Sequence, residues 1–83
     1  MIQVKNVYFK HNGSEKPLIS GIRPPSKYAT EPKEGGENWN LITNTHFINC
    51  EFHPNCDIYK FRNCLFHDCS GVRYLNLENC EVR

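Results

Sequence analysis

The sequence predicts an all-β fold, a short solenoid of about two coils over residues 40–83 with the N-terminal part of the chain as its cap. An apolar residue recurs about every five positions, and a small residue often stands two places before it. This period fits neither an α-helix, at about 3.6 residues, nor a flat strand, at about 2. It fits a chain that turns a corner every five residues and points one large side chain inward on each side.

The recurring apolar residues are Ile42, Phe47, Phe52, Ile58, Phe66, Val72, Leu77 and Val82. The small residues that precede them are Thr45, Cys50, Cys56, Cys64, Ser70 and Cys80. Four sides make one square coil, and Phe61 takes the centre of a shortened side. The separations are then nearly constant for the predicted stacked pairs, which are Ile42 with Phe61, Phe47 with Phe66, Phe52 with Val72 and Ile58 with Leu77. The period slips at Asn55, at residues 61–63 and at Cys69.

A second pattern leaves two other folds open. The segment 47–54 matches the segment 61–68, and residues 77–82 repeat most of it once more. This similarity fits a tighter β-solenoid or duplicated strands in an ordinary small β fold. In each case Asn49, Asn63 and Asn79 recur beside a cysteine, and we expect them to satisfy backbone groups at corners and to stack as a ladder.

The sides Cys50-Glu51-Phe52, Ser70-Gly71-Val72, Leu75-Asn76-Leu77 and Cys80-Glu81-Val82 resemble the pentapeptide-repeat family, which favours a small residue, a polar one and then Leu or Phe. The resemblance covers residues 40–83, about half of the chain. It implies a right-handed quadrilateral β-helix. It also implies a target, because several pentapeptide-repeat proteins bind DNA gyrase or other DNA-handling machines. The short chain is also similar to phage-encoded inhibitors of host defence, such as anti-CRISPR proteins.

Residues 1–39 are predicted to form a hairpin and a long loop that cap the β-helix of residues 40–83, all within one compact domain. Apolar and polar residues alternate over residues 2–9, which favours a strand with a bulge at Asn6. The pair Asn12 and Gly13 indicates a turn, and residues 17–22 are expected to return as the second strand. Residues 26–38 are polar and contain Pro32, Gly35 and Gly36, which is typical of a loop.

Charge and composition argue against several classes of protein. The net charge is +1, with six Lys or Arg against four Glu in residues 1–40 and four against five acids in residues 41–83. Neither half has the basic excess of a nucleic-acid-binding protein, so no direct contact with nucleic acid is expected. We also expect no membrane segment and no signal peptide, and therefore a cytoplasmic location, in the host cell if the protein is phage-encoded. The five cysteines are expected to be reduced.

Two cysteine–histidine clusters suggest a metal. Cys50, His53 and Cys56 form one cluster, and Cys64, His67 and Cys69 form the other, and four such ligands suffice for zinc. In a solenoid, however, the cysteines point inward and the histidines lie on outer corners. We therefore expect packing cysteines, no metal, no cofactor and no catalytic residue, so that the protein is not an enzyme. A small structural zinc-binding domain is the alternative.

The sequence favours a non-enzymatic protein-interaction module. Large aromatic and basic residues are the candidates for contact, since Tyr, Trp and Arg dominate binding hot spots. The predicted protein-binding residues are Tyr28, Trp39, Tyr59, Arg62, Arg73 and Tyr74. Trp39 has a second interpretation, as a lid over the first coil.

The expected partner is a nucleic-acid-handling protein complex, either a host-defence nuclease complex of CRISPR type or a gyrase-like enzyme. This expectation follows from the resemblance alone. A structural component of a viral particle is an alternative role. A homodimer through an open end of the solenoid is also considered, because such an end needs a cover.

Overall fold

The computed structural model describes residues 1–13, 18 and 39–83, and all structural statements concern these residues. Nine short strands and two 3-10 helices are present there, without an α-helix. The elements are β1 (Ile2–Lys5), β2 (Tyr8–Phe9), β3 (Leu41–Thr43), β4 (Thr45–Ile48), β5 (Glu51–Phe52), η1 (Pro54–Ile58), β6 (Lys60–Arg62), β7 (Leu65–His67), η2 (Val72–Tyr74), β8 (Asn76–Glu78) and β9 (Glu81–Val82).

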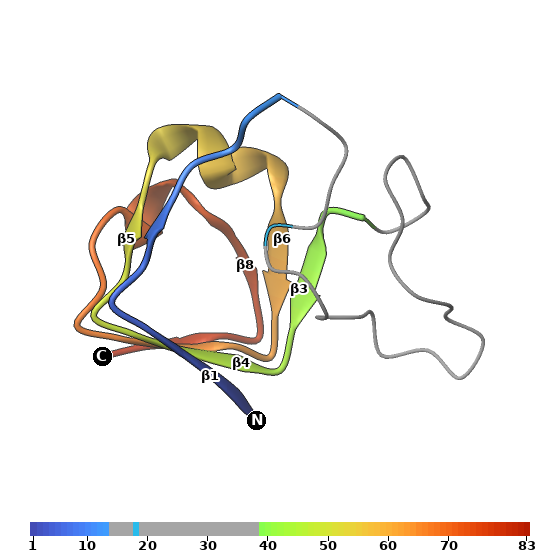
Figure 1. The fold of residues 1–83 in the computed structure, drawn as a ribbon. Coiled ribbons are helices and arrows are strands. Elements are labelled where there is room, and N and C mark those ends of the chain that lie inside the picture. The colour runs from blue at the N-terminus through green and yellow to red at the C-terminus, as the bar shows by residue number, and fades with distance from the viewer. Residues whose placement is uncertain (14–17, 19–38) are drawn as a thin grey trace.

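The strands form three small sheets in which every pairing is parallel. Their strand orders are β1-β4-β7-β9, β2-β5 and β3-β6-β8. Successive strands of the chain lie in different sheets, so the chain passes from sheet to sheet and returns one layer further on. Figure 1 shows a four-sided outline, with the two 3-10 helices on the fourth side. The predicted all-β class is confirmed, and the arrangement is compatible with a short β-helix.

Of the four predicted stacked pairs two are right and two are wrong, since the parallel bridge between Glu51 and Ser70 puts Gly71, not Val72, opposite Phe52. Ile42 pairs with Phe61 and Phe47 pairs with Phe66, as expected. Leu77, however, pairs with Phe61 and not with Ile58. The second step between layers is therefore shorter along the chain than the first, because the second coil has the short η2 where the first has the longer η1. Val82 follows the same shorter step and pairs with Phe66.

The side occupied by η1 explains why the prediction of an inward Ile58 is wrong. A 3-10 helix has about three residues per turn, so positions three apart share a face. Cys56 and Tyr59 are accordingly buried, whereas Ile58 is 42% exposed. Val72 and Leu75 show the same spacing at η2 and are both buried. Val82, also expected inside, is 55% exposed because no further layer covers β9 among the described residues.

Asparagine marks the corners. The non-glycine residues with positive φ are Asn6, Asn44, Asn49, Asn63, Asp68 and Asn79, at 52° to 59°. Asn and Asp tolerate this left-handed conformation better than other residues. Corner residues of neighbouring layers are linked, since Asn79 Nδ2 donates to Asn63 Oδ1 at 2.6 Å and Asn49 Nδ2 donates to Asn6 Oδ1 at 2.7 Å. Of the expected ladder, the step from Asn63 to Asn79 is present, whereas Asn49 lies in another corner column and bonds Asn6.

Phenylalanine fills the interior. Phe47, Phe61 and Phe66 are fully buried, and Phe52 nearly so. The rings of Phe47 and Phe66 stack at 5.1 Å between centroids, and Phe61 meets both edge-on. Stacked and edge-on pairs are the favourable arrangements of aromatic rings. The repeat of large apolar residues in the sequence therefore corresponds to one continuous aromatic core.

The N-terminal segment joins the sheets. β1 pairs in parallel with β4, and β2 pairs in parallel with β5, so residues 2–9 add a layer to two sides. The expected bulge at Asn6 is a corner between these two strands. The return strand expected over residues 17–22 lies outside the described residues, apart from Leu18, and so does the predicted loop over residues 26–38. Within the part of the chain that is described, no helix is long and apolar enough to cross a membrane.

Candidate binding surfaces

The predicted contact residues lie in different environments. Tyr28 falls outside the described residues. Trp39 is half-buried, and its ring lies 6.0 Å from His11 and 5.9 Å from Tyr59. It packs against the edge of the core. The interpretation of Trp39 as a lid over the coil is thus supported by its contacts.

Tyr59 does not point outward as expected. Its side chain is 3% exposed, and its hydroxyl lies 2.9 Å from Nδ1 of His11. The i, i+3 geometry of η1 turns it toward the interior. His11 is held in turn by Asn55, which accepts from the His11 N–H at 3.0 Å and donates to its carbonyl at 2.9 Å. The Tyr59 side chain is therefore part of the core and offers almost no surface to a partner.

Arg62 is half-exposed and engaged in an ion pair on the outer face of β6 and β8. Its Nε donates to Glu78, and Lys60 Nζ lies 3.6 Å from the same carboxylate. The hydrogen bond from Arg62, with the positive charges of Arg62 and Lys60, lowers the pKa of Glu78. Because the group is exposed, water and salt screen this interaction and it contributes little to stability.

Arg73 and Tyr74 lie on the surface together. Arg73 Nη2 donates to the Tyr74 hydroxyl at 2.8 Å, and its guanidinium carbon is 4.9 Å from the Tyr74 ring centroid. Tyr74 is 43% exposed. Lys60 pairs with Asn76 in the next layer, and Tyr74 follows Ile58 by the same number of residues. Ile58 and Tyr74 therefore hold equivalent places in successive layers. We call Ile58, Arg73 and Tyr74 the 3-10 face, since η1 and η2 carry them.

The cysteines that follow a corner share one hydrogen-bonding pattern. Cys50, Cys64, Cys69 and Cys80 each place their thiol near the carbonyl two residues earlier and near a carbonyl of the preceding layer, at 3.3 to 3.7 Å. Thr45 holds the same place one layer earlier, and its hydroxyl donates to the Thr43 carbonyl at 3.0 Å. A small residue with one donor therefore suits this position.

Burial makes several of these thiols weak acids. It raises the pKa of the Cys64 thiol to about 11, and it raises the pKa of the Cys56 and Cys69 thiols as well. A thiol of this kind is neutral at physiological pH, whereas a nucleophilic cysteine needs an accessible thiolate. All five cysteines are free.

The histidines of the two clusters have other contacts. His53 precedes η1, and its Nδ1 accepts from the Asn55 N–H at 3.1 Å. His67 is exposed, with its Nε2 3.3 Å from Asp68 and its ring stacked 6.3 Å from that of His46. Within residues 1–13, 18 and 39–83, no group of three or more His, Cys, Asp or Glu is arranged to hold a metal ion.

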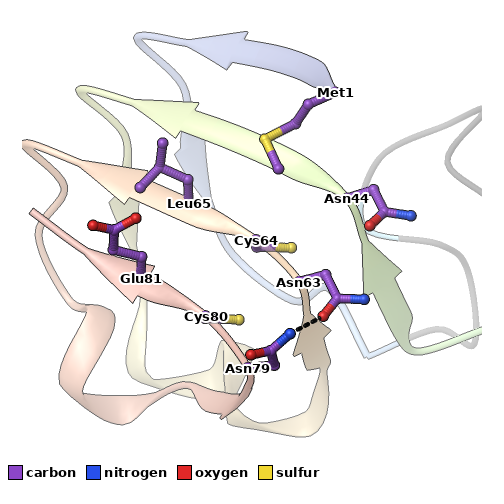
Figure 2. A pocket seen from close by; sticks show the side chains of 8 residues that line it. All are labelled: Met1, Asn44, Asn63, Cys64, Leu65, Asn79, Cys80 and Glu81. Carbon is purple, nitrogen blue, oxygen red and sulfur yellow. Dashed lines mark hydrogen bonds between the residues drawn. The ribbon is translucent and has the colours of Figure 1, made fainter.

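An open groove of about 470 Å³ follows one corner of the coil. Its lining includes Met1, the corner residues Asn44, Asn63 and Asn79, and the thiols of Cys64 and Cys80 (Figure 2). The five-residue period did not reveal this groove. The signal in the sequence was the Asn-Cys pair at residues 63–64 and 79–80, which the structure places on one corner column; the same pair at residues 49–50 lies on another corner and that at residues 55–56 lies in η1.

The geometry defines the protein as a small all-parallel β protein, compatible with a short β-helix, with polar corners and an aromatic interior. Comparisons with protein-family models, with curated proteins and with solved structures found no match to this chain.

Proposed function

We propose that this chain is a non-enzymatic protein-interaction module that binds through its 3-10 face. The observation that carries the proposal is the exposed pair of Arg73 and Tyr74, held together by a hydrogen bond and by contact of the guanidinium with the ring. Arg and Tyr are enriched at binding hot spots. Mutual contact restricts their rotamers before binding, which reduces the entropy lost on association.

The 3-10 face also has an apolar component. Ile58 and Tyr74 are 42% and 43% exposed, although they are large. The face rests on Cys56, Tyr59, Val72 and Leu75, which are buried beneath it. Two exposed apolar side chains, with the Arg73 cation beside Tyr74, suit a protein partner.

The finer assignment of the fold belongs to this proposal. We infer a right-handed quadrilateral β-helix of the pentapeptide-repeat type. The four-sided outline, the small residues after the corners and the column of phenylalanines support it. The inferred partner, a CRISPR-type nuclease complex or a gyrase-like enzyme, follows from this resemblance and remains a prediction. The cytoplasmic location and a homodimer through a solenoid end also stay predictions.

The test is a direct binding measurement with each purified candidate complex. We expect the immobilised protein to bind one of them, and we expect the double variant Arg73→Ala with Tyr74→Ala to bind at least about tenfold more weakly. Tyr8→Ala is the matched control, because Tyr8 is an exposed tyrosine on another side of the coil, at 53%. Binding by neither complex, or equal losses in the double variant and the control, would contradict the proposal.

A further inference from the structure

The outward residues of the two 3-10 helices form a square of four side chains. η1 and η2 lie in contact, and the step of the chain that relates Ile58 to Tyr74 also relates Asp57 to Arg73. All four side chains are exposed. The first layer therefore presents an acid beside an aliphatic side chain. The second presents a base beside an aromatic ring, in the same order along the chain.

The two charges of this square take part in none of the ion pairs between described residues. Those pairs join Glu78 with Lys60 and Arg62, Asp68 with His67, and Glu81 with Arg83. Arg73 hydrogen-bonds instead to Tyr74, its neighbour in the same layer. Both charges of the square are therefore open to a partner whose charges have the matching pattern.

The square is complementary to itself. A second copy can face it about a two-fold axis that runs along the 3-10 helices, between the two layers, and this axis reverses the order of the layers. Asp57 of each copy then lies opposite Arg73 of the other, and Ile58 of each lies opposite Tyr74 of the other. A two-fold axis makes each such contact twice, as in isologous dimers. A two-fold axis parallel to the coil would instead leave every charge opposite an uncharged side chain.

We propose that the protein forms an isologous dimer through this square, with the two coils antiparallel. The inference goes beyond the proposed function, because the occupant is a second copy and no other partner is needed. Opposite charges set the register of the contact. A patch of two short helices is smaller than a standard interface, so the dimer is weak and in rapid exchange with the monomer. It covers Arg73 and Tyr74, and it therefore competes with any other protein for the 3-10 face.

The test is sedimentation equilibrium of the purified protein alone, over concentrations from about 10 µM to about 1 mM. We expect the average mass of the parent protein to rise from that of the monomer toward that of the dimer. Arg73→Asp and Asp57→Arg each place like charges opposite one another, so each variant alone should dimerise at least about tenfold more weakly. Arg83→Asp is the matched control, a charge reversal at the end of β9, and should change the affinity by less than about twofold.

An equal mixture of the two face variants gives the sharper result. Arg73→Asp carries two acids in the square and Asp57→Arg carries two bases, so the mixed dimer again matches every charge with its opposite. The mixture should regain the affinity of the parent protein to within about threefold. Circular dichroism of each variant verifies that it is folded.

Concentration-dependent NMR chemical shifts of the parent protein provide a measurement that does not rely on a variant. The shifts should gather at residues 57–58 and 73–74. The proposal is overturned if the parent stays monomeric up to about 1 mM, or if folded variants remain monomeric when mixed. It is also overturned if the shifts gather elsewhere, as around Val82 for a dimer through the open end of the coil. None of these results bears on binding to the candidate complexes, which is measured separately.

Discussion

The corners that contain an Asn or Asp with positive φ depend on a pair of neighbouring residues with separate tasks. An Asn or Asp adopts the left-handed conformation, and in most corners the next residue is Thr or Cys, whose side chain donates to backbone carbonyls. Cys64 and Cys80 are examples from two layers of one column. Cysteine suits this place because it is small, tolerates burial and still has a weak donor.

The ionisation of Cys64 predicts a loss of stability at alkaline pH. The thiol ionises near pH 9 when it is exposed in the unfolded chain and near 11 in the folded one. The folded state is therefore favoured below pH 9, and this contribution, up to about 2–3 kcal/mol, is lost as the pH rises toward 11. Urea unfolding at pH 7.5, 9 and 10.5 measures the decline.

Cys64→Ser is the control for this pH dependence, because serine does not titrate in this range. The variant should show a shallower decline than the parent protein. Part of the decline should persist, since burial also raises the pKa of Cys56, Cys69 and Tyr59. Identical curves for the two proteins would contradict the assignment to Cys64.

Among the elements, the 3-10 helices determine which side chains face inward on the fourth side. Their period of about three residues buries Cys56 with Tyr59, and Val72 with Leu75. The entry into η2 needs Gly71, whose φ is +77° and whose position leaves no room for a Cβ atom. A Cβ built there would overlap the carbonyl oxygen of Phe52, which is backbone and cannot rotate away.

Gly71→Ala should therefore destabilise the protein by about 3 kcal/mol or more, measured from the midpoint of urea unfolding. Gly13→Ala is the matched control, since Gly13 also has a positive φ, +88°, but its Cβ would meet no atom within 4 Å. The control should lose only about 1–2 kcal/mol, the cost of the left-handed conformation. Equal losses would show that the contact with Phe52 is unimportant.

The similarity between residues 47–54 and 61–68 is also explained by the elements. Both segments contain the end of a strand followed by an asparagine corner, at residues 47–50 and 61–64. The two corners lie on adjacent sides of the coil. The match of residues 61–66 with 77–82, by contrast, joins successive layers. The first match therefore reflects a shared local structure, while the second is a true stacking repeat.

In the molecule as a whole, one aromatic column connects the layers. Phe66 stacks on Phe47 and contacts Phe52 and Phe61, so it links several sides at once. Phe66→Asp should unfold the protein, because an unpaired carboxylate in that column costs at least about 5 kcal/mol, comparable with the total stability of a domain of this size.

The expected result is the loss of cooperative thermal unfolding and of the β-type circular dichroism spectrum. Arg73→Ala, a change at an exposed position, should leave both unchanged within about 0.5 kcal/mol. A folded Phe66→Asp variant with the thermal stability of the parent would contradict the central place of this ring.

Residue types at regular spacing were enough to predict the class of the fold and most of its interior. The period of apolar residues predicted an all-β coil, the pairings of Ile42 with Phe61 and of Phe47 with Phe66, and the asparagine corners. Each of these depends on residue types that are close together or regularly spaced in the chain. The same pattern separated inward cysteines from outward histidines, which is why a zinc site was not preferred.

The register after Pro54 and the composition of the surfaces depend on contacts that form only in the folded molecule. Tyr59 and Ile58 exchange places because a short 3-10 helix replaces a straight side. That helix contacts η2, and Tyr59 bonds His11 of the N-terminal segment, so both contacts join parts that are distant in the chain. The parallel addition of β1 and β2 to strands much later in the chain, as when Ile2 pairs with Thr45, likewise leaves no local signal. Contacts between distant segments are chosen by the whole core, so the spacing of neighbours along the chain could not predict them.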